Sequence, residues 1–470
     1  MKTLFVNPPV SANQRYGILS QAGAVEPPLG LASLAATARK MGFETSLLDA
    51  AALGYGLEET AVAICEKNPS LLGITLTTVS VKTSSALAKK LKEKLPGITI
   101  IIGGPHFTAL PEKTLLENAA FDIGVLGEGE RTLEALLRAL REGASLTSVQ
   151  GIVFKADGKL LRTPSRDRIR DLDELPFPAF DLLPRLDRYY RVPTQSIKEM
   201  PCVSLVTSRG CPGRCVFCDR AIFGNQVRLH SAAYVAEMML LLQKEYGIRG
   251  IFFEDDNFLL SEERLEELSR LIRKKNIRIA WSALSRIDII TENRLKIAKQ
   301  SGCWQILYGI ESGSQPILDF YDKGITLDEI RIKIRLTQKQ GFSTKGFFML
   351  GNPLETAETL KQTADFIKSL GLDDISLTYF TPYPGSEVWN RIHEFGTLDT
   401  EWDRFSCFDP VFIPAGLSKE QIVAAHRSIL KDFYSSPRVY WSYLKRIRSL
   451  NQVREFYRSW KAVSAHTRGD

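Results

Sequence analysis

The sequence predicts an α/β protein that consists of a doubly wound domain, a partial (β/α)6 barrel and a helical C-terminal region. Short apolar segments alternate with helical patterns over the first 140 residues, and the alternation resumes with a longer period from residue 202. The 470 residues are too many for one ordinary domain. The composition, 44% hydrophobic and 24% charged, is typical of a globular protein, and no charge-free apolar run reaches the roughly 18 residues that a membrane helix needs.

The first alternation of strands and helices occupies residues 1–150. Its predicted strands cover residues 2–7, 44–50, 71–78, 98–104 and 123–129. Its predicted helices cover residues 30–42, 57–67, 83–94, 111–118 and 130–142. Because such repeats give a parallel sheet with helices on both faces, we expect a ligand outside the carboxyl ends of the five strands.

Residues 151–200 interrupt this pattern. They are rich in Arg, Asp and Pro, and they predict an extended connector with little regular structure on the protein surface.

A second set of strands is predicted in residues 201–400, and each strand but the last precedes a helical segment. The strands cover residues 202–208, 250–256, 277–283, 305–312, 343–351 and 374–380. Parallel strands with right-handed crossovers fit an incomplete barrel whose active site lies at the carboxyl ends of the strands. Residues 401–470 are expected to be helical and basic.

The net charge of +7 is concentrated near the C-terminus. Residues 431–470 hold nine Lys or Arg against Asp432, Glu455 and Asp470, so they supply +6 and the rest of the chain is nearly neutral. This distribution does not favour a nucleic-acid-binding protein. The N-terminal run MKTLFVNPPV has one lysine and too short an apolar stretch for a secretory signal, and we expect a cytoplasmic protein.

Three of the seven cysteines are crowded as Cys211, Cys215 and Cys218, directly after the first barrel strand. The Pro-Gly pair between the first two favours a tight turn, so the three sulfurs can converge on one centre. Three thiolates suffice to hold a 4Fe-4S cluster and leave its fourth iron open to a substrate. The alternative is a zinc site that Cys202 or His230 completes.

The spacing of these cysteines, with Phe217 before the last of them, resembles the signature of radical S-adenosylmethionine enzymes. In that family the open iron chelates S-adenosylmethionine, and one electron cleaves it to a 5'-deoxyadenosyl radical. Later segments match the family's strand motifs: FFEDDNF (252–258), WSALSRID (281–288), LYGIESGS (307–314), GFFMLGNP (346–353) and TPYPGSEVW (381–389). The resemblance therefore predicts an iron-sulfur barrel enzyme.

Residue by residue, the resemblance assigns roles in binding S-adenosylmethionine. Glu254, Asp255 and Asp256 would hold the methionine amino group. Arg286 and Glu311 would hold the carboxylate and the ribose, and Gly351 would lie beside the adenine. The alternative for Asp255 and Asp256 is a divalent-ion site, since paired carboxylates at a strand end also suit a metal.

The first strand-to-helix turn of a doubly wound, Rossmann-like domain commonly binds a dinucleotide, but this chain has Asn7, Pro8 and Pro9 there. Proline offers no N–H to a pyrophosphate, so a nicotinamide or flavin site at this turn is not expected. The run Gly127-Glu128-Gly129-Glu130 opens a helix but lacks a third glycine.

Residues 1–400 instead resemble class B radical S-adenosylmethionine enzymes, in which a cobalamin-binding domain precedes the barrel. NPPV, PPLGLASLAA (27–36), GGPHFT (103–108), GEGERT (127–132) and DLDELPFPAFDLLP (171–184) occur in the expected order. The resemblance assigns these residues to the cobalamin site: Asn7, Pro8, Thr77, Thr78, Val79, Gly103, Gly104, His106, Gly127, Glu128 and Gly129.

The Asp-x-His-x-x-Gly sequence that ligates cobalt in other cobalamin domains is missing from the first loop. We therefore expect cobalamin to bind with its own base displaced and with no protein histidine on cobalt. Thr77, Thr78 and Val79 would approach the lower face, and His106 is expected to form hydrogen bonds or pack, with cobalt ligation as the alternative.

The resemblance implies a cobalamin-dependent radical enzyme that methylates an unactivated carbon by way of methylcobalamin. The alternatives are cyclisation, ring contraction or rearrangement with the same cofactors, a sensor or electron-transfer protein, and a zinc-dependent nucleic-acid-modifying protein. We expect a small-molecule substrate that is lipid-like or otherwise apolar, flavodoxin or ferredoxin as electron donor, and no nucleic acid.

The tail, residues 438–463, mixes aromatic and basic residues. Helical spacing puts Tyr440, Tyr443, Leu444 and Ile447 on one face, continued by Leu450 and Val453, with Lys445, Arg446 and Arg448 largely off it. We expect either a helix packed on the barrel or peripheral contact with an anionic membrane.

Overall fold

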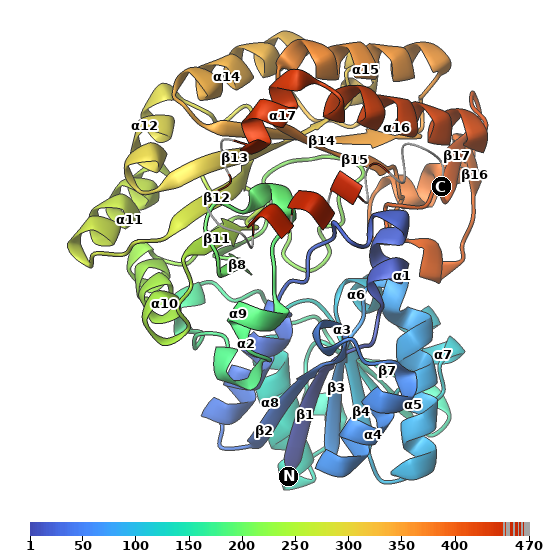
Figure 1. Cartoon of the computed structure of the whole chain (residues 1–470). Helices are drawn as coiled ribbons and strands as arrows, with labels where there is room; N and C mark the ends of the chain where they lie inside the picture. The colour runs from blue at the N-terminus through green and yellow to red at the C-terminus, as the bar shows by residue number, and fades with distance from the viewer. Residues whose placement is uncertain (445–446, 448–451, 455, 459, 462–463, 465–470) are drawn as a thin grey trace.

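The computed structural model describes residues 1–444, 447, 452–454, 456–458, 460–461 and 464. Two separate sheets organise the chain, a mainly parallel one in the N-terminal domain and a parallel one in the barrel domain (Figure 1). The doubly wound domain and the partial barrel that the sequence predicts are both confirmed.

The first sheet has the strand order β2-β1-β3-β4-β5-β6-β7, in which β1 to β5 are parallel. The strands are β1 (Lys2–Asn7), β2 (Glu44–Asp49), β3 (Leu71–Thr75), β4 (Thr99–Gly103), β5 (Ile123–Val125), β6 (Ile152–Ala156) and β7 (Lys159–Arg162). The helices are α1 (Ala12–Tyr16), α2 (Leu29–Lys40), α3 (Ala50–Leu53), α4 (Leu57–Lys67), α5 (Val81–Lys94), α6 (Pro105–Ala109), α7 (Pro111–Glu117) and α8 (Gly129–Glu142). All five predicted strands are present.

The hairpin β6–β7 corrects two predictions, because it extends the sheet beyond five strands and lies in the supposed irregular connector. Its turn is Asp157-Gly158, with φ of 48° and 73°. An Asp-Gly turn with positive φ at both residues is a strong hairpin signal, which the sequence interpretation overlooked. The remainder of the connector has the short helix α9 (Leu186–Tyr189) and single 3-10 turns.

The second sheet has six parallel strands in sequence order, which form the open barrel. The strands are β8 (Cys202–Leu205), β11 (Gly250–Phe253), β12 (Ala280–Ser285), β13 (Cys303–Glu311), β14 (Ser343–Leu350) and β15 (Asp374–Tyr379). The helices are α10 (Ala232–Glu245), α11 (Glu262–Lys274), α12 (Glu292–Gln300), α13 (Gln315–Phe320), α14 (Leu327–Lys339) and α15 (Ala357–Leu370). The helices cover the outer face of the sheet (Figure 1).

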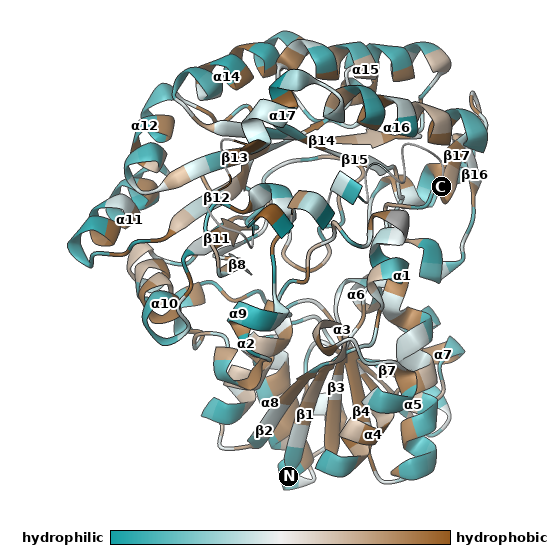
Figure 2. Cartoon of the chain, viewed as in Figure 1, coloured by the Kyte–Doolittle hydropathy of each residue, from teal (hydrophilic) through white to brown (hydrophobic). Residues whose placement is uncertain are grey.

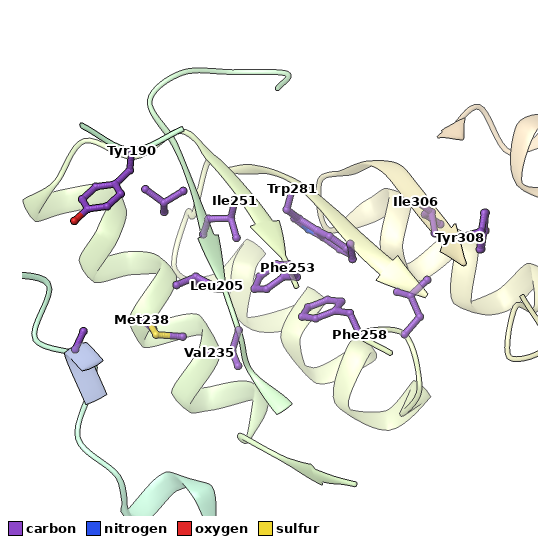
Figure 3. Packing of buried hydrophobic residues seen from close by; sticks show 14 of the residues in the cluster. Tyr190, Leu205, Val235, Met238, Ile251, Phe253, Phe258, Trp281, Ile306 and Tyr308 are labelled. Atoms are coloured by element: carbon purple, nitrogen blue, oxygen red, sulfur yellow. The ribbon is translucent and has the colours of Figure 1, made fainter. Parts of the chain in front are cut away.

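Alternate residues of the barrel strands point to opposite faces of the sheet, one toward the outer helices and the other toward the barrel interior. Ile251 and Phe253 of β11 pack with Val235 and Met238 of α10 in the outer core (Figure 3). Phe252 lies on the opposite face, where it borders the barrel interior. The strands are hydrophobic and the outer helices amphipathic (Figure 2), as expected for a sheet buried on both faces.

The C-terminal region combines a hairpin with two helices. Its elements are β16 (Gly396–Leu398), β17 (Phe412–Pro414), α16 (Lys419–Tyr434) and α17 (Pro437–Leu444). Trp402 and Phe405 pack with Val81 of the first domain, which ties this region to the N-terminal domain. Among the described residues, the structure contains no helix long and apolar enough to cross a bilayer.

The predicted apolar stripe of the tail is wrong in part. Val439 is buried, whereas Tyr440 and Leu444 are 48% and 55% exposed. Tyr443 does pack inward, and its hydroxyl donates a hydrogen bond to Asp374 at 2.8 Å. Leu450, Lys445, Arg446 and Arg448 lie outside the described residues.

Candidate active site

The three crowded cysteines lie in a loop closed by a small antiparallel ribbon of β9 (Ser208–Arg209) and β10 (Arg228–Leu229). We call residues 210–227 the cluster loop. A Cβ atom on Gly213 would lie 3.4 Å from Cys211 Sγ and 3.8 Å from Cys215 Sγ, so both sulfurs border one small space. The thiols of Cys215 and Cys218 contact each other. Cys215 therefore lies near both of the other cysteines.

Positive charge surrounds the cysteines. Arg286 Nη1 lies 3.8 Å from Cys215 Sγ, and Arg286 Nη2 donates to the carbonyl of Lys323 at 2.7 Å. The hydrogen bond from Cys218, followed by the charges of Lys323 and Arg286, lowers the pKa of Cys215 to about 6. Burial raises the pKa of Cys211, and the hydrogen bond that Cys218 donates to Cys215 raises the pKa of Cys218. The site therefore favours at least one thiolate at neutral pH.

The contacts of Cys202 and His230 bear on the zinc alternative. Within the described part of the chain, no three His, Cys, Asp or Glu side chains are gathered closely enough to hold a metal ion. Cys202 is buried at the start of β8, and His230 Nδ1 contacts Asp173 Oδ1 at 3.1 Å. Neither side chain supplies a fourth ligand at the three cysteines. Among the described residues, the same search finds no divalent-ion site at Asp255 and Asp256.

Of the residues assigned by resemblance to later strand ends, Arg286 and Glu311 lie beside the cysteines. Glu311, at φ 72°, is buried and accepts a hydrogen bond from Lys323 Nζ at 2.6 Å. Phe217 packs edge-on against Tyr321, with ring centroids 4.7 Å apart, and Lys323 Nζ lies 5.8 Å from its ring centroid. Gly351, at φ 80°, follows β14 and donates to Glu355.

The carboxylates after β11 differ in their surroundings. Asp255 is 1% exposed, and its Oδ1 accepts hydrogen bonds from the backbone N–H and hydroxyl of Thr207, whereas its Oδ2 is buried without a hydrogen-bond partner among the described residues. Glu254 accepts from Ser204 and lines the barrel interior. Asp256 is exposed, and its charge acts on Cys211.

The first domain contains a slot of about 230 Å³ at the carboxyl ends of β3, β4 and β5. Its walls are apolar side chains and many glycines, and the predicted cobalamin residues among them are Gly103, Gly104, Gly127, Glu128 and Gly129. At Gly104, with φ 103°, a Cβ atom would lie 2.8 Å from the carbonyl oxygen of Leu76. The glycines therefore keep the slot open to a flat or extended group.

Other residues predicted for the cobalamin site lie outside the slot. Asn7 donates to Asp49 at 2.8 Å, and Pro8 is buried. Thr77 is exposed, Val79 is half-buried and Thr78 is buried.

His106 forms a polar and aromatic contact of its own, as expected for a packing histidine. It is 3% exposed, and its Nδ1 lies 3.2 Å from Thr78 Oγ1. Its ring meets Trp402 edge-on with centroids 5.2 Å apart. Burial, followed by the charge of Lys113, lowers the pKa of His106 to about 4, so the ring is neutral at pH 7.

A second cavity, the barrel pocket, has a volume of about 470 Å³. Its walls are apolar side chains of the barrel strands, such as Phe252, Leu307 and Phe347. The loop after β1, over residues 16–26, covers it, so the first domain forms part of its wall. Burial, followed by the nearby Glu26 carboxyl, raises the pKa of Glu254 to about 9.

Comparison with known proteins agrees with this arrangement. The B12 binding domain family matches residues 16–137, and the radical SAM superfamily matches residues 205–367. An uncharacterized methyltransferase of Pyrococcus horikoshii is 36% identical over 441 residues, which are 93% of this chain and 94% of the relative. The chain belongs to the B12-binding radical SAM enzymes.

Two further similarities bear on the fold and on the range of chemistry. An anaerobic magnesium-protoporphyrin IX monomethyl ester cyclase of Rubrivivax gelatinosus is 25% identical over 92% of this chain and 77% of the relative. The structure of the radical S-adenosylmethionine methyltransferase TsrM from Kitasatospora setae, with cobalamin and a [4Fe-4S] cluster bound, has a TM-score of 0.70, 18% identity and 99% coverage of both chains.

The residues of this radical SAM enzyme fit both resident cofactors. Three neighbouring cysteines suit a 4Fe-4S cluster that keeps one open iron. The slot, whose walls are mainly apolar side chains and glycines, suits the narrow nucleotide tail of a cobalamin.

Three residues of the site were missed by the sequence interpretation. Asn257 donates to Cys211 Sγ at 3.6 Å and accepts from the backbone N–H of Arg286 at 2.8 Å. Lys323 faces Glu311, and Arg209 binds two carboxylates of the first domain. Asn257 belongs to the motif FFEDDNF and Arg209 precedes the first cysteine, so position offered a signal; nothing singled out Lys323.

Proposed function

We propose that this enzyme methylates an unactivated carbon of a small, apolar molecule, with S-adenosylmethionine and cobalamin. One observation carries the proposal: the loop after β1 covers the barrel pocket, so a cofactor on the first domain's strand ends would face the cavity of the barrel. When bound, the cluster with S-adenosylmethionine supplies a carbon radical, and cobalamin carries the methyl group.

The chain's own residues would bind and orient these groups. Arg286 and Lys323 are the cations beside the cysteines, and a guanidinium can bind a ligand carboxylate through two hydrogen bonds if it exchanges its present partner, Asp288. Asp256 and Glu311 are the anions nearest the cysteines, and Glu311 would exchange its pairing with Lys323 to bind an amino group or ribose. Closure of the barrel by the loop after β1 would exclude water from a reactive radical.

The barrel pocket supports an apolar, uncharged substrate. Lys345, the cation among its lining residues, is already paired with buried Asp374 at 2.9 Å. The raised pKa of Glu254 keeps that carboxyl neutral at pH 7. A charged substrate would lose its hydration without finding an unpaired partner, whereas apolar surface is favoured there.

The slot and His106 support cobalamin with its base displaced. The slot, of about 230 Å³, opens at the carboxyl ends of the strands, where a displaced base could insert, and His106 contacts Thr78 and Trp402. The contact with Thr78 engages Nδ1 of that histidine, which favours cobalt without a protein nitrogen.

The reaction is tested with trideuteromethyl S-adenosylmethionine. The reconstituted protein is incubated without oxygen with this reagent, cobalamin, a strong reductant and an extract of the source organism. We expect 5'-deoxyadenosine and a product that gains one labelled methyl group, found by untargeted mass spectrometry. A product that loses hydrogen or rearranges without label would favour the cyclase-like alternative, and failure to cleave S-adenosylmethionine would contradict both.

We also propose flavodoxin or ferredoxin as the electron donor. Cys218 reaches the surface and Arg214, with a side chain 79% exposed, lies in the same loop. An acidic one-electron carrier could dock there within reach of the cluster. Reduction of the cluster by each protein, followed by absorbance, tests this.

The C-terminal region supports peripheral membrane contact by a cytoplasmic protein. Of the fourteen exposed large hydrophobic side chains in the described part of the chain, six lie within residues 440–460. They are Tyr440, Trp441, Leu444, Val453, Tyr457 and Trp460. Aromatic residues with a surplus of positive charge suit an anionic interface. Sedimentation with phosphatidylglycerol but not phosphatidylcholine vesicles, weakened by salt, is expected; equal recovery in the supernatant would contradict it.

A further inference from the structure

Two arginines face each other at the base of the cluster loop. Arg209 of β9 and Arg228 of β10 are direct partners in the ribbon that closes the loop. Their side chains are only 14% and 7% exposed. Like charges directly opposite each other destabilise a strand pair, and burial increases the cost, so the ribbon needs anions from elsewhere.

Those anions come from one loop of the first domain. Arg209 Nη1 lies 3.2 Å from Glu128 Oε2, and Arg209 Nη2 lies 2.5 Å from Glu130 Oε1. Arg228 also pairs with Glu128. The two carboxylates are 4% and 5% exposed, and Ser33 donates to Glu130 at 2.9 Å. We call Glu128, Glu130, Arg209 and Arg228 the interdomain clasp.

The interdomain clasp also borders the slot of the first domain. Glu128, Glu130 and Arg209 are among the residues that line the slot. Ile222 and Phe223 of the cluster loop line it too, and Arg209 lies 5.4 Å from the ring centroid of Phe223. One wall of the slot is therefore made by the loop that carries the three cysteines.

We propose that the interdomain clasp positions the cluster loop against the slot, so that the 4Fe-4S cluster and cobalamin bind cooperatively. The inference rests on the proposed placement of the cobalamin tail in the slot. Glu128 and Glu130, with Arg209 and Arg228, are positioning residues, because they act on both cofactors through the loops that they join.

The physical basis is that both cofactors order the same segment, the cluster loop. A cluster fixes Cys211, Cys215 and Cys218, which lie between Arg209 and the slot residues Ile222 and Phe223. A ligand in the slot packs on the same two side chains and so restricts the loop from its other end. The cofactor that binds first bears the entropy cost of ordering the cluster loop. The second cofactor therefore binds more tightly. Linkage makes the effect reciprocal at equilibrium.

The test compares cobalamin binding to two forms of the full chain, one with the reconstituted cluster and one after chelator treatment. Hydroxocobalamin is titrated into each form without oxygen, and its dissociation constant is measured from absorbance. We expect at least about fivefold tighter binding to the cluster-bearing form. Conversely, saturating hydroxocobalamin should slow the release of iron to the chelator.

Variants separate the interdomain clasp from general stability. The pair Glu128→Gln and Glu130→Gln should bring the ratio of the two dissociation constants to about one. Arg209→Lys, which keeps the charge but loses the forked contact, should give an intermediate ratio. Glu134→Gln is the matched control, since Glu134 lies on the same helix and pairs only with half-exposed Arg131 among the ion pairs described. It should keep the wild-type ratio.

Each outcome decides the proposal. Equal dissociation constants in the wild type, or an unchanged ratio in the double Gln variant, would overturn the cooperative role. If the double variant does not fold, the ratio in Arg209→Lys decides, and a wild-type value contradicts the proposal. No hydroxocobalamin binding in either wild-type form would contradict the cobalamin site itself, which is a failure of the proposed function and not of the interdomain clasp alone.

Discussion

The two cofactor regions of this enzyme are built from opposite materials. The cluster site consists of charged and sulfur-bearing side chains, with Arg286 and Lys323 beside the three cysteines. The slot of the first domain consists mainly of apolar side chains and glycines, such as Gly103 and Gly104. An iron-sulfur cluster needs ligating and charged side chains. A cofactor tail that inserts at the edge of a sheet instead needs open space and positions where the backbone can come close to it.

The largest expected effect on activity comes from changes at the cluster site. Replacement of Cys211, Cys215 and Cys218 by Ala should remove the cluster and all cleavage of S-adenosylmethionine, because only these three of the seven cysteines are crowded together in the sequence. Ala at Cys65, Cys202, Cys303 or Cys407 should leave the cluster in place. Iron and sulfide analysis checks this, and a full cluster in the triple variant would contradict the assignment.

The proposed binding of cobalamin in the slot is tested by a substitution that fills the slot. Gly103 lines the slot, and an added Cβ would have ordinary contacts, the nearest at 3.5 Å from the carbonyl oxygen of Val125. Gly103→Leu should therefore weaken cobalamin binding about a hundredfold, roughly 3 kcal/mol, by occupying the space.

The cluster content of Gly103→Leu should stay near the wild-type value, which distinguishes a local block from misfolding. Gly97→Ala is the control, since Gly97 lies outside the slot in open space. Unchanged cobalamin affinity in Gly103→Leu would contradict the placement of the tail.

The difference between the two cofactor regions also explains which features the sequence could predict. The cysteine spacing and strand alternation predicted the cluster and both sheets, since ligand geometry and hydrophobic periodicity are local. The partners of Glu128 could not be predicted, because Arg209 and Arg228 come from another domain. The hairpin at Asp157-Gly158 was readable but overlooked. The ligand role of Asp255 stays a prediction, because its Oδ1 binds Thr207 while its buried Oδ2 has no hydrogen-bond partner in the described part of the chain.

A buried ion pair at the cluster site should matter more than its exposed neighbour. Lys323 and Glu311 pair at 2.6 Å with side chains 8% and 10% exposed. Lys323→Met would leave Glu311 buried without a partner, and we expect a loss of about 3–5 kcal/mol in the free energy of unfolding. Arg214→Met removes the exposed pair with Asp322 and should cost less than about 1 kcal/mol. Chemical denaturation measures both, and equal losses would contradict the account.

A further effect is expected on the pH dependence of stability, through Glu254 in the barrel pocket. Its pKa of about 9 in the folded state exceeds the ordinary 4.5, so the folded state binds its proton more tightly. The wild type should therefore lose stability as the pH rises from about 4.5 to about 9. Glu254→Gln should be the more stable protein at the upper end by at least about 1.4 kcal/mol, the free energy of a tenfold change in proton affinity. Thermal unfolding across this range checks it, and a constant difference would contradict the neutral carboxyl.

The measurement that tests the central claim most directly is electron paramagnetic resonance of the cobalt(II) form bound to the full chain. With the cofactor's base in the slot and His106 held by Thr78 and Trp402, the spectrum should show no nitrogen hyperfine splitting from an axial ligand. Nitrogen splitting that persists in His106→Ala would place the cofactor's own base on cobalt and contradict the slot. Nitrogen splitting that disappears in His106→Ala would make that histidine the ligand and contradict the arrangement of the first domain described above.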